Sequence, residues 1–108
     1  MTSNARVTSN ARVTGNGRLQ VSGSVTVQTV ASLTGIAAQA AGQSDLVIDM
    51  QHVEIVDSAA VSLMLLWLRE AQRNKVNLCF EHVPENLLSL ARLYDVAELL
   101  PLCRPNTP

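Results

Sequence analysis

The stretch DLVIDMQHVEIVDSAAVSLMLLWLREAQRN, residues 45–74, decides the fold of this chain. It begins with a short apolar run, Leu46 to Met50, bounded by polar residues, which predicts a strand covered on both faces, as in a parallel sheet. A polar link from Gln51 to Asp57 follows, and Ser58 opens a long apolar helix. Because that helix packs back on the sheet, Asp57 and Ser58 are expected where the strand ends and the helix begins. In open α/β sheets, ligands and partners usually bind at such ends.

On the N-terminal side, the sequence predicts a hairpin and then a helix. Gly15-Asn16-Gly17 predicts a tight turn between a strand near Ala11 to Thr14 and a strand at Arg18 to Ser22. Gly23 is expected to end the second strand. Apolar residues at helical spacing then predict a helix that starts at Thr26 or Gln28 and runs to about Ala41.

On the C-terminal side, the sequence again predicts a strand followed by a helix. Val76 to Phe80 predicts a fourth strand, and Pro84 suits the first position of a helix that runs to about Tyr94. A further short helical turn is expected at Ala97 to Leu100. The sheet-facing residues of the helix from Pro84 are expected to be Leu87, Leu88, Ala91 and Leu93 or Tyr94.

This order of elements predicts an α/β fold: a four-stranded mixed, largely parallel sheet with about four helices. The domain is expected to span residues 11–102, between a leader of residues 1–10 and a tail of residues 103–108. The unit Thr-Ser-Asn-Ala-Arg-Val occurs at Thr2 to Val7 and again at Thr8 to Val13, and Ser-Asn-Ala resembles the scar of a cleaved purification tag. We therefore expect part of the leader to be foreign to the natural protein.

Composition excludes several classes of function. Apolar residues make up 47% of the 108 residues, which predicts a filled core. A net charge of −1, with one each of Phe, Tyr and Trp, does not suit a nucleic-acid binder. The apolar run Ala59 to Leu68 is too short to span a bilayer, and no secretory signal opens the chain. Two cysteines make no disulfide framework, so we expect Cys79 to be a buried, reduced thiol in a cytosolic domain.

No pattern typical of catalysis is present in the sequence. His52 and His82 are thirty residues apart, and neither has a Cys or a second His at ligand spacing. Ser58 lacks the glycine-flanked turn of a nucleophilic serine and an obvious base. We therefore predict a protein that is not an enzyme, with no catalytic residue, no cofactor and no metal.

The pair Asp57-Ser58 has two readings. Both residue types are favoured helix N-caps, because a side-chain oxygen satisfies free amides of the first turn. The pair can equally be a binding site and a switch, since a phosphate on Ser58 adds about −1.5 to −2 charge at the mouth of a helix. Small residues follow that admit a close partner, and the expected partner-binding set is Asp57, Ser58, Ala59, Ala60 and Val61.

The sequence from about Leu19 to Pro101 resembles the STAS family, which includes anti-sigma-factor antagonists and a subunit of lipid-transporting ABC complexes. The resemblance rests on Leu19 to Gly23, the family's opening strand and glycine, and on Leu46 to Met50 followed by Val53 to Ser58, its central strand and signature loop. Ser58 stands where the antagonists carry their phosphorylated serine or threonine. Ala59-Ala60 stand where the antagonists usually have glycine.

Within this family, the segment from Leu90 to Pro101 looks most like the Mla-type (toluene-tolerance) subunit. That resemblance implies a cytoplasmic protein, peripheral to the inner membrane, that binds the ATPase of a phospholipid-transport ABC complex. It places Asp57 and Ser58 at the ATPase interface. The alternative that the resemblance leaves open is an anti-sigma-factor antagonist, which binds a serine kinase and is switched by phosphorylation of Ser58.

Overall fold

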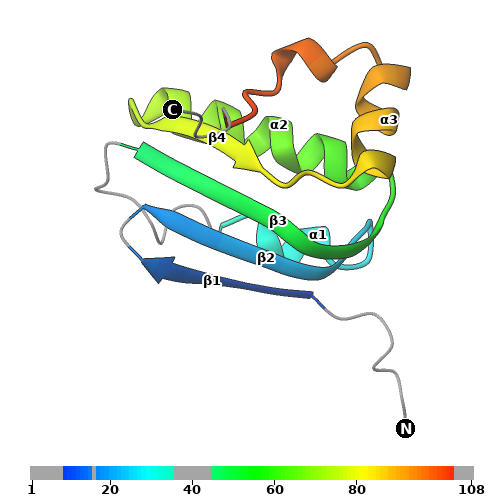
Figure 1. Cartoon of the computed structure of the whole chain (residues 1–108), viewed down its shortest axis with the longest axis horizontal. Helices are drawn as coiled ribbons and strands as arrows, with labels where there is room; N and C mark the ends of the chain where they lie inside the picture. Colours follow the sequence, from blue (N-terminus) through cyan, green and yellow to red (C-terminus); the bar gives the residue numbers. More distant parts are fainter. Residues whose placement is uncertain (1–8, 16, 36–44, 104–108) are drawn as a thin grey trace, which may run out of the picture.

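The structure is a computed structural model that describes residues 9–15, 17–35 and 45–103. The elements follow one another in the order shown in Figure 1, and they are β1 Ser9–Gly15, β2 Arg18–Val25, α1 Val30–Leu33, β3 Asp45–Val56, α2 Ser58–Arg73, β4 Asn77–Glu81, α3 Glu85–Leu93 and the 3₁₀ turn η2 Ala97–Leu99.

The four strands form one sheet in the order β1-β2-β3-β4. β1 pairs with β2 antiparallel, whereas β2, β3 and β4 are mutually parallel. Gly17 closes the hairpin between β1 and β2 with a φ of 73°, as the glycine-rich turn predicts, while Asn16 lies outside the described residues. The α/β class is confirmed. The described part of the chain holds three α-helices and one 3₁₀ turn, rather than about four helices.

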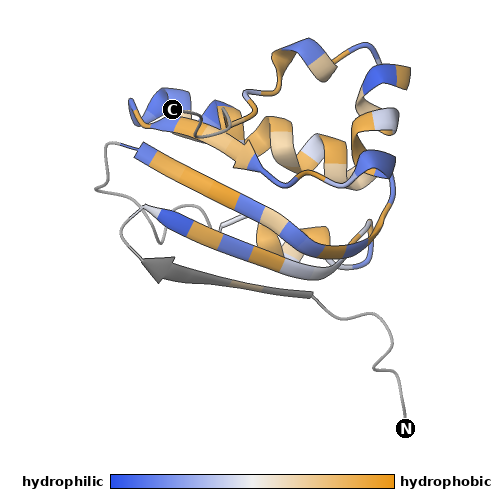
Figure 2. Cartoon of the chain, viewed as in Figure 1, coloured by the Kyte–Doolittle hydropathy of each residue, from blue (hydrophilic) through white to orange (hydrophobic). Residues whose placement is uncertain are grey.

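One face of the sheet is apolar and carries the helices. In Figure 1, α1 and α2 lie behind the strands, and Figure 2 shows hydrophobic and hydrophilic bands alternating along β2. The core joins this face to the inner side of α2, and its largest fully buried residues include Leu19, Ile48, Met50, Leu63, Met64, Trp67 and Phe80. On the opposite face, β3 carries Val47, which is half-buried, and Asp49, which is buried, so the predicted covering of both faces of the central strand is only partial there.

The helix α2 begins at Ser58, as predicted, and its inner side is fixed by the single tryptophan. Trp67 is fully buried, and its Nε1 donates a hydrogen bond of 3.2 Å to the carbonyl oxygen of Leu33 in α1. This bond satisfies a buried indole and holds the short helix α1 against α2. Within the described ranges, no helix combines the length and the apolarity that crossing a bilayer requires.

The central strand is longer than predicted. The segment Gln51 to Val56, expected as a polar link, continues β3, because β2 also continues through Gly23 and supplies a pairing partner. Gly23 does not end β2. It has a φ of 84° within the strand, next to one of two register irregularities between β2 and β3. The link between β3 and α2 is therefore a single residue, Asp57.

Both predicted outer helices differ from the expectation. α1 is one turn, and the remainder of the predicted helix, from residue 36 onward, lies outside the described residues. In α3, Leu87 and Ala91 are buried as expected, but Leu93 and Tyr94 are exposed. The reason is that Leu93 is two residues beyond Ala91 and therefore on another side of α3, while Tyr94 is the C-cap at the end of the helix.

The cysteines are joined, which corrects the expectation of a reduced, buried thiol at Cys79. Cys79 in β4 forms a disulfide with Cys103, and their Cα atoms lie 4.9 Å apart. Cys103, which was assigned to the tail, lies beside β4 because its N–H donates to the carbonyl oxygen of Phe80 and the N–H of Phe80 donates to Pro101. At the other end, Ser9 and Asn10 were assigned to the leader, and both pair with β2.

Candidate functional site

Asp57 connects three elements at the point where β3 ends. Its Oδ1 accepts a hydrogen bond of 2.9 Å from the backbone N–H of Ala59, which makes Asp57 the N-cap of α2. Its Oδ2 accepts a second bond of 3.1 Å from the N–H of Val27, in the turn between β2 and α1. Its own N–H donates to the carbonyl oxygen of Val25 at 3.4 Å. One side chain therefore fixes both the start of α2 and the neighbouring turn.

Ser58 is held by this arrangement in an exposed position, as the first residue of α2. Since Asp57 provides the cap, the hydroxyl of Ser58 is left without a hydrogen bond to any residue that the structure describes. The cap and the exposed hydroxyl thus belong to different residues. The two readings of the pair from sequence are compatible, with Asp57 as the structural residue and Ser58 as the available one.

A groove runs along α2 beside Ser58. It has a volume of about 340 Å³ and is lined by Ser58, Val61, Ser62, Leu65, Tyr94 and Val96. Its four residues from α2 have the spacing i, i+3, i+4 and i+7, which places them on one side of the helix. The other wall is formed by the chain that follows α3. We call these six residues the α2 groove.

The expected partner-binding residues are therefore only partly at the surface. Ala60 is 0% exposed and Val61 is 4% exposed, because both lie on the side of α2 that meets the core. In this conformation Ala60 lies in the core, and its role in partner binding stays a prediction. Its spacing to Leu63 and Met64 is the apolar period of a buried helix face, and this signal was present in the sequence.

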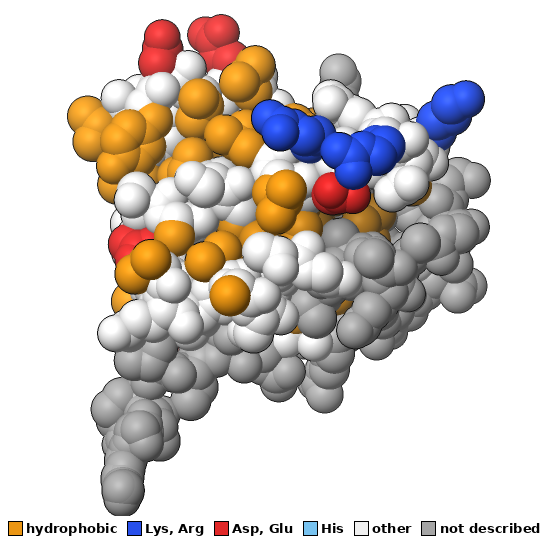
Figure 3. All heavy atoms as spheres, turned by 180° about the vertical axis from the view of Figure 1, so that it is seen from behind, with side chains coloured by type: hydrophobic (Ala, Val, Ile, Leu, Met, Phe, Trp, Pro, Cys, Tyr) orange, Lys and Arg blue, Asp and Glu red, His pale blue; other side chains and the backbone are white. Residues whose placement is uncertain are grey.

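Sequence reasoning missed Ser62 and Leu65 in this groove, although their spacing from Ser58 contained the signal. Tyr94 and Val96 carried no such signal, because they come from a separate segment. Large apolar side chains are exposed near this site, including Val27 at 72% and Leu93 at 74%. Figure 3 shows apolar side chains gathered at the upper left, on the side where α3 and η2 lie. Exposed apolar surface of this kind is typical of protein interaction sites.

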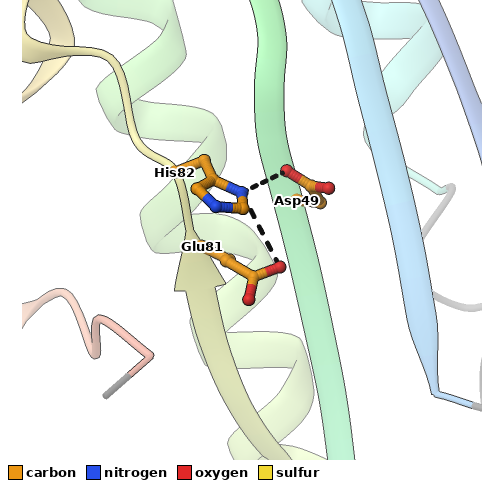
Figure 4. Close-up of side chains that lie close together, drawn as sticks. All are labelled: Asp49, Glu81 and His82. Carbon is orange, nitrogen blue, oxygen red and sulfur yellow. Dashed lines mark hydrogen bonds and ion pairs between the residues drawn. The ribbon is translucent and has the colours of Figure 1, made fainter. Parts of the chain in front are cut away.

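A second cluster of functional groups lies on the polar face of the sheet. Asp49 in β3, Glu81 at the end of β4 and His82 converge in Figure 4, and their ligand-type atoms all lie within 4.8 Å of one another. His82 Nδ1 is 3.1 Å from Asp49 Oδ1 and 3.8 Å from Glu81 Oε1. Spacing in the sequence gave His82 no ligand neighbours, whereas the fold provides two carboxylates.

These carboxylates already have a cation. Arg18 at the start of β2 forms ion pairs with Glu81 and, at 3.5 Å, with Asp49. A metal ion bound to Asp49, Glu81 and His82 would have to compete with this guanidinium. The cluster is best described as an ion-pair network that joins three parallel strands.

The network perturbs the protonation of Asp49. Burial alone raises the pKa of its carboxyl group, because it disfavours the charged form. The hydrogen bond from the N–H of Gln51, followed by the hydrogen bond and charge of His82 and the charge of Arg18, outweighs burial and lowers the pKa. The carboxylate of Asp49 is therefore ionised throughout the neutral pH range.

Comparison with known proteins agrees with this architecture. Direct comparison with the sequences of curated proteins gives no match. Among solved structures, the fold is similar to that of a protein described as "Structure of the Anti-Sigma Factor Antagonist SpoIIAA in its Unphosphorylated Form", with a TM-score of 0.67. The two sequences are 10% identical, and the match covers 90% of this chain and 89% of that chain. The family model described as "Mlab, STAS domain" matches residues 9–101. That match covers most of the sequence, and the chain belongs to the STAS domain family.

Proposed function

We propose that this chain is a non-enzymatic accessory subunit that binds and regulates the cytoplasmic ATPase of a phospholipid-transport ABC complex. The observation that carries the proposal is the exposed Ser58 beside the α2 groove, on a domain whose family model is described as Mlab. In this proposal the chain is cytoplasmic and reaches the inner membrane only through its partner. It needs no cofactor.

The site suits the docking of a protein surface better than the binding of a substrate. Its polar groups are the hydroxyls of Ser58, Ser62 and Tyr94, and none of the groove residues carries a charge. The lining is otherwise apolar, and exposed Val27 and Leu93 add apolar area nearby. Apolar area surrounded by polar groups is typical of protein interfaces. Asp57 would act by holding Ser58 in place, while Ser58 makes the contact.

A pair of charge variants on α2 tests the proposal. Ser62→Glu places a carboxylate in the α2 groove, whereas Gln72→Glu places the same charge on an exposed residue of the same helix, outside the groove. We expect Ser62→Glu to weaken binding to the ATPase by about tenfold or more, since it would desolvate an unpaired charge. Gln72→Glu should bind like the natural sequence.

The measurement is co-purification, followed by titration of the chain into the isolated ATPase and an assay of ATP hydrolysis. Ser58→Asp provides a second test at the mouth of the groove. If the natural chain does not bind the ATPase, the proposed partner is wrong. If it binds but Ser62→Glu and Ser58→Asp leave the affinity unchanged, the partner is right and the proposed interface is wrong.

The second candidate function is an anti-sigma-factor antagonist switched by phosphorylation of Ser58. It is favoured by the exposed hydroxyl of Ser58 at a helix start and by the fold similarity to an antagonist. A phosphate there would find donors already engaged, because the N–H groups of Ala59 and Ala60 donate to Asp57. It would also meet the charge of Asp57. Incubation with an anti-sigma serine kinase tests this function. If the natural chain takes up one phosphate per molecule and Ser58→Ala takes up none, the antagonist function would replace the ATPase proposal.

A further inference from the structure

The disulfide closes one outer edge of the sheet. β4 is the last strand in the sheet order, so among the described residues no further strand lies beside its outer backbone groups. The segment Pro101 to Cys103 occupies part of that edge. The N–H of Phe80 donates to the carbonyl oxygen of Pro101 at 2.8 Å, and the N–H of Cys103 donates to the carbonyl oxygen of Phe80 at 2.8 Å. Figure 1 shows this segment returning from η2 to β4. We call it the edge segment.

Apart from the disulfide and these two hydrogen bonds, the described residues give the edge segment little support. Its pairing with β4 is a single parallel bridge between Phe80 and Leu102. The side chain of Leu102 is exposed rather than packed in the core. The residue before the segment, Leu100, is 5% exposed and anchors the chain in the core. Release of the disulfide should therefore free the three residues of the edge segment and stop at Leu100.

We infer that Cys79 and Cys103 are a thiol–disulfide modification site that controls access to the outer edge of β4. Both residues are half-buried, so a small dithiol can approach them. The inference rests on the proposed function in one respect, which is the cytoplasmic location. Glutathione and thioredoxins keep most cytosolic thiols reduced, and disulfides that do form there are usually transient or redox-sensing.

The chemistry is exchange with a dithiol reductant. A thiolate of the reductant attacks one Sγ, the Cys79–Cys103 bond breaks, and the other cysteine leaves as a thiolate. The second thiol of the reductant then displaces the first cysteine and closes the reductant's own disulfide. Two electrons pass to the protein, and each cysteine takes up a proton. The reverse reaction needs a disulfide oxidant such as oxidised glutathione.

Hydrogen exchange on the isolated full chain, oxidised with glutathione disulfide and then treated with dithiothreitol, tests the inference. We expect the amides of Phe80 and Cys103 to exchange about tenfold or more faster after reduction. The Val47 amide, which donates to Gly17, and the peptides of α2 should accelerate by a smaller factor, which reports the lower global stability of the reduced chain. The double variant Cys79→Ser with Cys103→Ser should resemble the reduced chain and ignore dithiothreitol.

Three results would overturn the inference: two free thiols after oxidation, unchanged exchange rates at Phe80 and Cys103, or an equal acceleration of all amides. The last result would show that the disulfide stabilises the whole fold and not the edge segment in particular. If the double variant does not fold, the natural chain with and without dithiothreitol decides the question. No ATPase is present in this experiment, so its failure is separate from failure of the proposed docking. Binding of the ATPase by the reduced chain can be measured independently.

Discussion

Removal of the Asp57 carboxylate should weaken the fold by an amount that the structure allows us to work out. Asp57→Ala deletes the N-cap bond to Ala59, which costs about 1 kcal/mol. It also deletes the bond from the N–H of Val27, worth up to about 1 kcal/mol. Because Val27 is exposed, water replaces part of that second bond. The free energy of unfolding should therefore fall by about 1.5 to 2 kcal/mol.

Two further variants separate the contributions. Asp57→Asn keeps one carbonyl oxygen as an acceptor and loses the negative charge at the helix start, so we expect a loss of about 1 kcal/mol. Ser58→Ala removes a hydroxyl with no hydrogen bond to the described residues, so its effect should stay within about 0.5 kcal/mol. The order of stability should be Ser58→Ala, then Asp57→Asn, then Asp57→Ala.

Urea unfolding followed by tryptophan fluorescence is the assay, because Trp67 is the single tryptophan and is fully buried. The slope with urea should remain the same in all three variants, since the buried surface does not change. If Ser58→Ala were as destabilised as Asp57→Ala, the assignment of the cap to Asp57 would be wrong. An Asp57→Ala variant as stable as the natural chain would refute the reasoning altogether.

Three other perturbations follow from the structure. Reduction of Cys79–Cys103, which are 24 residues apart, should lower the free energy of unfolding by about 3 kcal/mol in urea titrations, and the double serine variant should not respond to reductant. Ala60→Glu buries a charge in the core and should abolish the cooperative unfolding seen by circular dichroism. Because the pKa of Asp49 is lowered in the folded chain, the unfolded chain binds this proton first as the pH falls. Stability that Asp49 contributes above about pH 4 should be lost below it, and urea titrations of Asp49→Asn should show a weaker acid dependence.

Local patterns predicted the parts of the fold that local physics decides. The apolar period of residues 58–73 predicted α2, because a helix needs only its own backbone hydrogen bonds and one buried side. Gly17 in the hairpin and Pro84 before α3 could be predicted in the same way, because a positive φ favours glycine and the fixed φ of proline suits the start of a helix. Ser58 at the start of α2 could also be predicted, since Asp and Ser are both common caps.

The remaining features depend on segments that are distant in sequence. The continuation of β3 to Val56 depends on the bulged pairing with β2, and a polar composition concealed it. The α2 groove needs Tyr94 from beyond α3 as its second wall. Arg18 meets Glu81 only after three strands align, and Cys79 meets Cys103 only after the chain returns to β4. The sequence pattern around each of these residues does not predict a contact with a residue so far away in the chain.

The positive φ of Gly23 has a consequence for a site that this residue does not touch. This glycine lies beside a register irregularity in which two residues of β3 follow one of β2, so the extra residue belongs to β3. Alternation along β2 is therefore unbroken, and Leu19, Val21 and Val25 are all buried in the core. The carbonyl oxygen of Val25 accepts a hydrogen bond from the N–H of Asp57, so the end of β2 helps to fix the mouth of α2. A side chain in place of Gly23 would strain the backbone of β2 there, and we expect it to alter the geometry around Ser58 without changing any residue of the α2 groove.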